Sequence, residues 1–451
     1  MERFRLAVLP RLALAALLPL SACASYRPHP INPNASAARL LARNLEDPGL
    51  LRFIAAEEKS AKDPPRWNLA TLSLVALYER PQMPIAKEGI LFAQGKEIAA
   101  KELPNPKLLL QPTYNATNAF PSPWKVGPIV AFLVESWGAR GARIARAKAE
   151  VGAAREALQR AAWGLRGQVA KALIAFWAAR RRLSLAKSVL LVAERYEKAL
   201  EVRFSAGMVS AASVNVARLA QSRAAIARAS ARRSLALAQS SLAFALGLPQ
   251  KALSGVRLDL ETLDHPRAPS KLSALTRQAL TRRPDLLRAL LRYKAAEAGL
   301  RLAIARQYPS LEIGPGYHYD EGDNKFILSL SLPLPILNQN QGAIASARAA
   351  RALAADRFLA AQTGALGAIE HARSDWRASR AERESARRLE SAAVDAQARA
   401  RAAFKAGAIG RLRLLGAKTQ LLQAKEGALA AAIHERTALA ELERALYHPF
   451  L

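Results

Sequence analysis

The chain has 451 residues, a formal net charge of +31 and a single cysteine. One cysteine excludes both an intramolecular disulfide framework and a zinc cluster built on cysteines. Half of the residues are hydrophobic (51%) but only 6% are aromatic, and Ala, Leu and Arg dominate. This composition predicts long helices rather than the core of an α/β enzyme. No run of 18 uncharged apolar residues occurs, so we expect no transmembrane helix.

Residues 1–22 have the pattern of a secretory signal peptide. A basic start is followed by the apolar stretch 12–20. The next residues, Leu20-Ser21-Ala22-Cys23, resemble the lipobox of bacterial lipoproteins, in which the cysteine is lipidated and becomes the new N-terminus. Ala24 follows instead of Asp, and the resemblance therefore implies the outer membrane. The alternative is an ordinary signal peptide with a chance cysteine. Cleavage removes three arginines and one glutamate and leaves a net charge of +29.

The remaining chain consists of two sequence repeats. Arg80-Pro81 aligns with Arg283-Pro284, and Pro106-Lys107-Leu108 aligns with Pro309-Ser310-Leu311. Further along, Phe204-Ser205-Ala206-Gly207 aligns with Phe404-Lys405-Ala406-Gly407. The offset stays at about 200 residues, so an ordered series of matches indicates a duplication. We divide the chain into the signal peptide 1–22, a lipidated segment 23–36, a first repeat 37–247, a linker 248–269 and a second repeat 270–451.

Each repeat is predicted to contain a helix, two strands, a very long helix, a tight turn and a second long helix. In the second repeat a helix starts at Pro284 and stops before Pro309. Strands are expected at 311–319 and 326–332, around a turn at 321–324. The first repeat has less regular strand candidates at 108–116 and 126–134. The long helices are expected at 141–203, 210–246, 342–405 and 411–447, and their apolar spacing is typical of coiled-coil packing.

The second strand of the second repeat alternates between apolar and polar residues. Phe326, Leu328, Leu330 and Leu332 share one face, and Ser329 and Ser331 share the other. Four short strands cannot close on themselves, and their apolar face needs a partner. Strands of about ten residues can cross a bilayer when tilted, provided that the barrel is closed.

These features together resemble the TolC-like outer membrane efflux family. The resemblance covers essentially the whole mature chain and depends on the order and spacing of the motifs. It implies a mainly α fold with a small transmembrane β part. Three copies would form a 12-stranded β-barrel in the outer membrane, continued by an α-helical barrel through the periplasm. It also implies a passive duct without catalytic residues and without a cofactor other than the lipid at Cys23. The expected partners are a homotrimer, a periplasmic adaptor, an inner-membrane transporter and outer membrane lipids.

The same resemblance assigns a role to the two helical turns. Both turns would dock on the adaptor through Ala206, Gly207, Met208, Val209, Ala406, Gly407, Ala408 and Ile409. Two plain turns without a partner are the alternative. Many family members place an Asp just after the turn, where it lines an inner aperture. Here the matching stretches hold Ser213, Asn215 and Arg413, so we expect a polar to basic aperture, unless Arg413 lies on an outer helix face.

Other functions find less support in the sequence. No two of the six histidines lie at i and i+4, and the HExxH motif is absent, so a metal site is not expected. The mature chain has only two methionines, which gives no support for a copper relay. The GxSxG and Walker motifs are also absent. The positive charge could indicate nucleic-acid binding, but the arginines are spread along all helices and the signal peptide exports the chain. A coiled-coil lipoprotein that tethers the membrane to the cell wall is the remaining alternative. The sequence does not select among a drug, a metal or a protein as cargo.

Overall fold

The computed structural model describes residues 25–57, 65–117, 121–135, 137–266 and 269–450. The chain divides into two units, Met1–Arg43 and Asn44–Leu451. The described part of the first unit contains helix α2 (Pro33–Ala42), and the Asn32 side chain caps it by accepting a hydrogen bond from the Ala35 N–H. Cys23 and the signal peptide lie outside the described residues, so lipidation stays a prediction. The following paragraphs concern the second unit.

The second unit is dominated by four long helices. The first repeat supplies α6 (Ala139–Ser205) and α7 (Ala211–Leu246), and the second repeat supplies α11 (Gln341–Lys405) and α12 (Arg411–Leu446). With 67 residues, α6 is about 100 Å long. The shorter elements are α3 (Pro48–Glu57), α4 (Leu69–Glu79), α5 (Gln82–Lys101), η2 (Gln250–Leu253), α8 (Glu261–Asp264), α9 (Leu272–Arg282) and α10 (Pro284–Ala305). The predicted long helices are thus confirmed within two residues at each end.

Local signals explain where these helices begin and end. Pro284 occupies the first turn of α10, where its missing N–H would have no helical partner. The Ser210 hydroxyl caps α7 by accepting a hydrogen bond from the Ser213 N–H. Gly410 precedes α12 without a capping side chain. Tyr447 adopts a left-handed conformation (φ 51°), which ends α12 one residue earlier than predicted.

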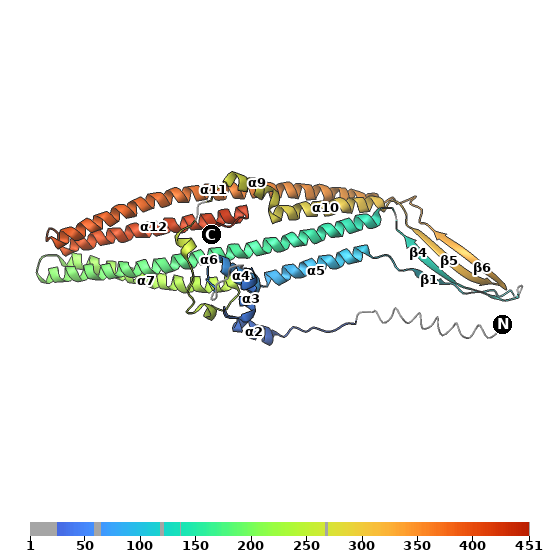
Figure 1. Cartoon of the computed structure of the whole chain (residues 1–451), viewed down its shortest axis with the longest axis horizontal. Helices are drawn as coiled ribbons and strands as arrows, with labels where there is room; N and C mark the ends of the chain where they lie inside the picture. The colour runs from blue at the N-terminus through green and yellow to red at the C-terminus, as the bar shows by residue number, and fades with distance from the viewer. Residues whose placement is uncertain (1–24, 58–64, 118–120, 136, 267–268, 451) are drawn as a thin grey trace. The chain divides into compact units, whose positions relative to one another are not determined.

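The helices pack as two hairpins that contact each other. Helix α6 packs along α7, α11 packs along α12, and α12 also packs against α6. Towards the sheet, α5 and α10 take the place of α7 and α12 as the neighbours of the long helices (Figure 1). The two long helices therefore join the sheet directly to the turns at the ends of the hairpins.

One antiparallel sheet contains strands from both repeats. Its members are β1 (Lys107–Leu110), β2 (Thr113–Tyr114), β3 (Trp124–Val126), β4 (Pro128–Val134), β5 (Leu311–Asp320) and β6 (Asp323–Ser331). Strand β5 pairs with β6 on one side and with β3 and β4 on the other, and β1 pairs with β4. The β4–β5 ladder is therefore the seam between the repeats.

The two hairpins differ in regularity. Glu321 and Gly322 both have positive φ and make the tight turn between β5 and β6, as in a type I′ hairpin. In the first repeat the expected strands 108–116 and 126–134 are not continuous, and that prediction was wrong. Pro112 offers no N–H to a ladder, and Gly127 runs so close to β5 that a Cβ there would lie 1.8 Å from the Tyr317 carbonyl oxygen. Each strand is consequently broken in two.

The main hydrophobic core lies where α3, α4, α6 and α7 meet. It includes Leu72, Val169, Leu173 and Leu242, none of which is accessible to solvent. Leu263 of α8 is equally buried in this core, together with Leu248. The stretch predicted as a linker thus connects the repeats and also fills part of the core.

A buried arginine marks the same place in each repeat. Arg80, before α5, donates to the Phe244 carbonyl in the last turn of α7 (2.8 Å). Arg283, before α10, donates to the Ala445 carbonyl in the last turn of α12 (2.7 Å). Each guanidinium also lies over an aromatic ring, Phe244 or Tyr447. The helix dipole favours a cation at a helix C-terminus. The arginine of each Arg-Pro motif therefore links the start of one helix to the last turn of another.

We expect Arg80→Ala and Arg283→Ala each to lower the free energy of unfolding by about 2 kcal/mol, because each leaves a buried carbonyl without its charged donor. The measurement is denaturant unfolding of the purified protein in detergent, followed by helical circular dichroism. Arg282→Ala is the matched control, since Arg282 is exposed. Equal midpoints for all three variants would contradict this assignment.

Candidate functional site

The turns at the ends of the two hairpins have the same geometry. We call residues 203–214 the first tip and residues 403–414 the second tip. At the first tip the Gly207 N–H donates to the Phe204 carbonyl and the Met208 N–H donates to the Arg203 carbonyl. At the second tip Gly407 and Ala408 repeat these bonds to Phe404 and Ala403. These are Schellman motifs, and the two glycines take the left-handed conformation (φ 72° and 74°) that the motif requires.

The two tips pack against each other. Leu200, Val214 and Ala217 of the first hairpin form a small buried cluster, and Leu412 of the second hairpin packs against it together with Val209. Both tips lie at the end of the hairpins opposite the sheet (Figure 1). They therefore form one continuous end of the unit, made from both repeats.

Most of the residues predicted to dock on a partner are exposed there. Ala206, Gly207, Met208, Ala406, Gly407 and Ala408 are exposed, whereas Val209 and Ile409 are half-buried. Met208 keeps 69% of its surface accessible. Such an exposed apolar side chain on a turn is a candidate contact for another protein.

The three aperture candidates lie just beyond the turns. Ser213 is half-buried and exchanges a hydrogen bond with the Ser210 hydroxyl (3.1 Å), so it is held in the cap of α7. Asn215 and Arg413 are both exposed; Asn215 is the fifth residue of α7 and Arg413 the third residue of α12. The geometry brings all three near one end of the hairpins, as the alignment of the repeats predicts.

The sheet has one continuous apolar face. The register places alternate residues of neighbouring strands on the same side, for example Phe132 of β4, Ile313 of β5 and Leu330 of β6. Phe326 is 88% accessible and Leu328 is 65% accessible. The face also carries Leu108, Leu110, Val130, Val134, Tyr317 and Leu330. Leu332, which the sequence placed on this strand, lies one residue beyond the end of β6. An apolar surface of this extent calls for a covering apolar environment.

Aromatic side chains gather on this face towards the hairpin end. Tyr114 and Trp124 are neighbours on β2 and β3 with ring centroids 5.0 Å apart, and both are exposed. Val126 lies opposite Tyr319, which puts this pair on the apolar side of the sheet. Trp and Tyr prefer the boundary between hydrocarbon and water. The aromatic residues thus indicate where such a boundary would run.

The opposite face of the sheet is more polar. Lys107 pairs with Glu312, and Asp320 accepts hydrogen bonds from Lys325 (2.9 Å) and Lys125 (3.4 Å). His318, Ser329 and Ser331 lie on the same side. The pairs Lys107–Glu312 and Lys125–Asp320 were not found in the sequence because each joins residues of different repeats. Lys325 and Asp320 lie in one hairpin, five residues apart, and were overlooked. The alternation in residues 326–332 had already placed Ser329 and Ser331 on this face.

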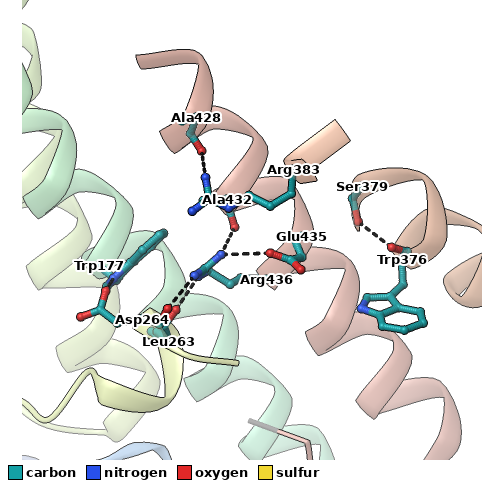
Figure 2. Close-up of polar contacts among 10 residues, drawn as sticks. All are labelled: Trp177, Leu263, Asp264, Trp376, Ser379, Arg383, Ala428, Ala432, Glu435 and Arg436. Atoms are coloured by element: carbon teal, nitrogen blue, oxygen red, sulfur yellow. Dashed lines mark hydrogen bonds and ion pairs between the residues drawn. The ribbon is translucent and has the colours of Figure 1, made fainter. Parts of the chain in front are cut away.

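A buried arginine clamps α12 to α6 through α8, about halfway along α6. Arg436 of α12 donates to the carbonyls of Leu263 and Asp264 of α8, and its guanidinium lies 4.7 Å from the centre of the Trp177 ring on α6 (Figure 2). The Trp177 indole N–H in turn donates to the Asp264 carboxylate (2.8 Å). Desolvation lowers the pKa of Arg436, although the group remains a cation because its normal pKa is so high.

An open groove of about 560 Å³ lies between α6, α7 and α12, nearer the tips than the clamp. Tyr196, Ala224 and Gln420 are among the residues that line it. The clamp therefore joins the hairpins at a level where their side chains interlock, and the groove separates parts of the same helices closer to the tips.

Two further properties of the described residues bear on the type of site. Among the described residues, no helix is both long enough and apolar enough to cross a membrane. Within the same residues, no three His, Cys, Asp or Glu side chains are grouped so that they could hold a metal ion.

Comparison with known proteins identifies the family. The family model described as "Outer membrane efflux protein" matches residues 111–248 and 275–446, which is more than half of the chain. The chain belongs to the outer membrane efflux protein family. The predicted TolC-like relationship and the outer membrane location are thereby confirmed. The family consists of channel components of efflux systems, so the tether without a pore is not favoured.

Individual relatives agree with this assignment. The cobalt-zinc-cadmium resistance protein CzcC of Cupriavidus metallidurans is 26% identical over 361 residues, which cover 79% of this chain and 84% of CzcC. A membrane protein from Pseudomonas aeruginosa has a TM-score of 0.68 at 22% identity, covering 84% of this chain and 93% of that one. The outer membrane protein VceC of Vibrio cholerae has the same TM-score at 19% identity, with coverages of 85% and 97%. The predicted fold of long helices with a small sheet is confirmed.

The Schellman geometry predicts that a Cβ atom at Gly407 destabilises the second tip. In Gly407→Ala the left-handed conformation at the C-terminal end of α11 becomes about 1 kcal/mol less favourable, because only glycine adopts it without strain. We expect amide hydrogen exchange at residues 403–414 to accelerate about fivefold, measured by mass spectrometry. Gly427→Ala is the control, since Gly427 lies within α12 with no atoms near a Cβ. Unchanged exchange in Gly407→Ala would contradict the Schellman assignment.

Proposed function

We propose that three copies of the chain form a passive channel through the outer membrane. Each copy contributes its sheet to a barrel of about twelve strands, with the apolar face towards lipid and the polar face towards the lumen. The helical hairpins continue this barrel into the periplasm. The observation that carries the proposal is a sheet with one apolar face, one polar face and two open edges.

The open edges are the reason for assembly. Among the described residues β1 pairs only with β4, and β6 pairs only with β5. In hydrocarbon an unpaired row of N–H and C=O groups costs several kcal/mol per group, so only a closed barrel is stable there. Four strands are too few to close around a lumen. Pairing β6 of one copy with β1 of the next removes both edges at once.

The N-terminus supplies a second attachment to the membrane. We assign residues 1–22 to a signal peptide and Cys23 to a lipidated N-terminus, on the basis of the lipobox-like sequence. Each buried CH₂ of an acyl chain contributes roughly 0.8 kcal/mol, so several chains would anchor the segment stably. No cofactor other than this covalent lipid is assigned.

The tips receive the other components of the efflux system. We assign docking on a periplasmic adaptor to the two tips, with Met208 as the most exposed apolar contact. The adaptor in turn connects the channel to an inner-membrane transporter. The duct carries no metal cluster within its described residues, and a passive channel has no need to coordinate its cargo.

Cross-linking tests the assembly. Leu109 on β1 and Ser329 on β6 lie on the edge strands, and we expect the double variant Leu109→Cys/Ser329→Cys to form disulfide-linked trimers in outer membranes. Non-reducing electrophoresis reads this out, and each single variant should stay unlinked. The wild-type chain serves as a further control, because a Cys23 whose sulfur carries a lipid gives no maleimide reaction. Monomers in the double variant, including after shifts of the cysteine position by two residues, would overturn the trimer.

Ion selectivity tests the aperture. We assign Arg413 to the inner constriction, where three symmetry copies would hold a positive potential and favour anions. In planar bilayers we expect the anion preference of the wild-type channel to fall about twofold or more in Arg413→Ala. The control is Lys251→Ala, which removes an exposed charge from η2. Identical selectivity in wild type and Arg413→Ala would place Arg413 outside the constriction.

A further inference from the structure

The two hairpin ends carry different charge. Residues 396–425, which include the second tip, contain seven basic residues and no acidic residue. The equivalent stretch of the first repeat, 196–225, contains four basic and two acidic residues. The two repeats therefore share the fold of the tips but differ in the net charge of the residues around them.

The pairing of these charges differs as well. In the first hairpin Arg218 of α7 donates to Glu197 (3.3 Å) and Glu201 (3.2 Å) of α6, and these bonds raise the pKa of Arg218. In the second hairpin the side chains nearest the turn are exposed and make no ion pair with any described residue. They are Arg399, Arg401, Lys405, Arg411 and Arg413. The positive charge at the second tip is therefore not neutralised within the described chain.

Local stability does not account for this arrangement. Arg411 and Arg413 lie in the first turn of α12, which contains no acidic residue. A helix N-terminus carries a partial positive charge, so a cation there costs about 0.3–1 kcal/mol instead of stabilising the helix. Lys405 ends α11, where the helix dipole favours a cation, but Arg401 lies one turn before it and repels it. Helix electrostatics therefore do not account for Arg411 and Arg413.

We propose that the second tip docks on an acidic surface of a partner protein and supplies the electrostatic part of that contact. The inference rests on the proposed function and defines the chemistry of the partner at the tips. Exposed Met208 and Phe404 lie beside the charges, and a protein partner would bury them as the apolar part of the interface. In the first hairpin Arg218 is already paired with Glu197 and Glu201, and the first tip contributes mainly the apolar contact of Met208. Charge complementarity of this kind accelerates association and makes it dependent on salt.

A lipid surface fits less well. The tips lie at the opposite end of α6 from the apolar sheet, about 100 Å along the helix axis. The outer membrane that holds the sheet therefore does not reach the second tip. The apolar residues at the tips are few and isolated, which suits a small protein contact better than insertion into a bilayer.

The test uses the full-length protein in detergent and two synthetic helical-hairpin peptides, one with a glutamate-rich turn and one with glutamines in their place. The second-tip variant is Arg401→Gln/Lys405→Gln/Arg411→Gln. The matched control, Lys198→Gln/Arg223→Gln/Arg228→Gln, removes three exposed charges from the first hairpin outside the first tip. Arg413 is left unchanged because it is assigned to the aperture. Vesicles of phosphatidylglycerol serve as the anionic lipid probe.

At 50 mM salt we expect the glutamate peptide to bind the second-tip variant about tenfold more weakly than wild type, while the control stays within about twofold. The difference should vanish at 500 mM salt, where exposed charges are screened. An equal loss in both variants would show that only the net charge matters, and no loss in either would show that these charges do not contribute to binding. Either result would overturn the proposal. Binding of the vesicles with the same dependence, without binding of the peptide, would overturn it in favour of a membrane surface.

Channel recording separates this inference from the proposed function. Wild type and second-tip variant should conduct equally in planar bilayers, because the changed residues are not assigned to the lumen. Conductance without discrimination between the peptides would remove the acidic partner and leave the channel intact. A wild-type protein that does not conduct would remove the channel itself, whatever the peptide binding.

Discussion

The pairing of β4 with β5 is the contact on which the membrane part of the molecule depends. It joins hairpins that are about 180 residues apart in the chain and fixes the register in which Phe132, Ile313 and Leu330 fall on one side. A shift by one residue would exchange the apolar and polar faces of the first repeat's strands relative to β5. Gly127 permits the close approach of the two strands at the point where any side chain would collide. The two-faced sheet is thus a property of the whole chain and of neither repeat alone.

The helical part is held together by cations directed at carbonyl oxygens. Arg80, Arg283 and Arg436 are all buried, and each donates to backbone carbonyls contributed by another element. In an alanine-rich helical protein the side chains fill little volume. A long arginine that lies against an aromatic ring fills space between helices and also donates hydrogen bonds to buried carbonyls. This explains part of the high arginine content without any ligand. It also distinguishes these arginines from the exposed ones at the second tip.

Most of the helix boundaries could be predicted from the sequence. The ends of the helices follow from proline, glycine and serine residues that act through their own backbone or their nearest neighbours, namely Pro284, Gly207, Gly407 and Ser210. The alternation in residues 326–332 gave one strand and its apolar face. The breaks at Pro112 and Gly127 escaped the first-repeat prediction, because the apolar pattern extends through both positions. Arg436 could not be recognised, since its partners Leu263 and Trp177 are about 170 and 260 residues away and only the folded chain brings them together.

The contacts that join the two hairpins bear on how such a channel opens. The clamp at Arg436 ties α12 to α6 through α8, whereas the open groove near Tyr196 separates α6, α7 and α12 between this level and the tips. Relative motion of the hairpins is easiest where few side chains interlock. The small cluster around Leu200, Val214 and Leu412 is then the main apolar contact that joins the two hairpin ends. A partner that binds both tips would act on this cluster, with the clamp as the fixed point about which the hairpin ends separate.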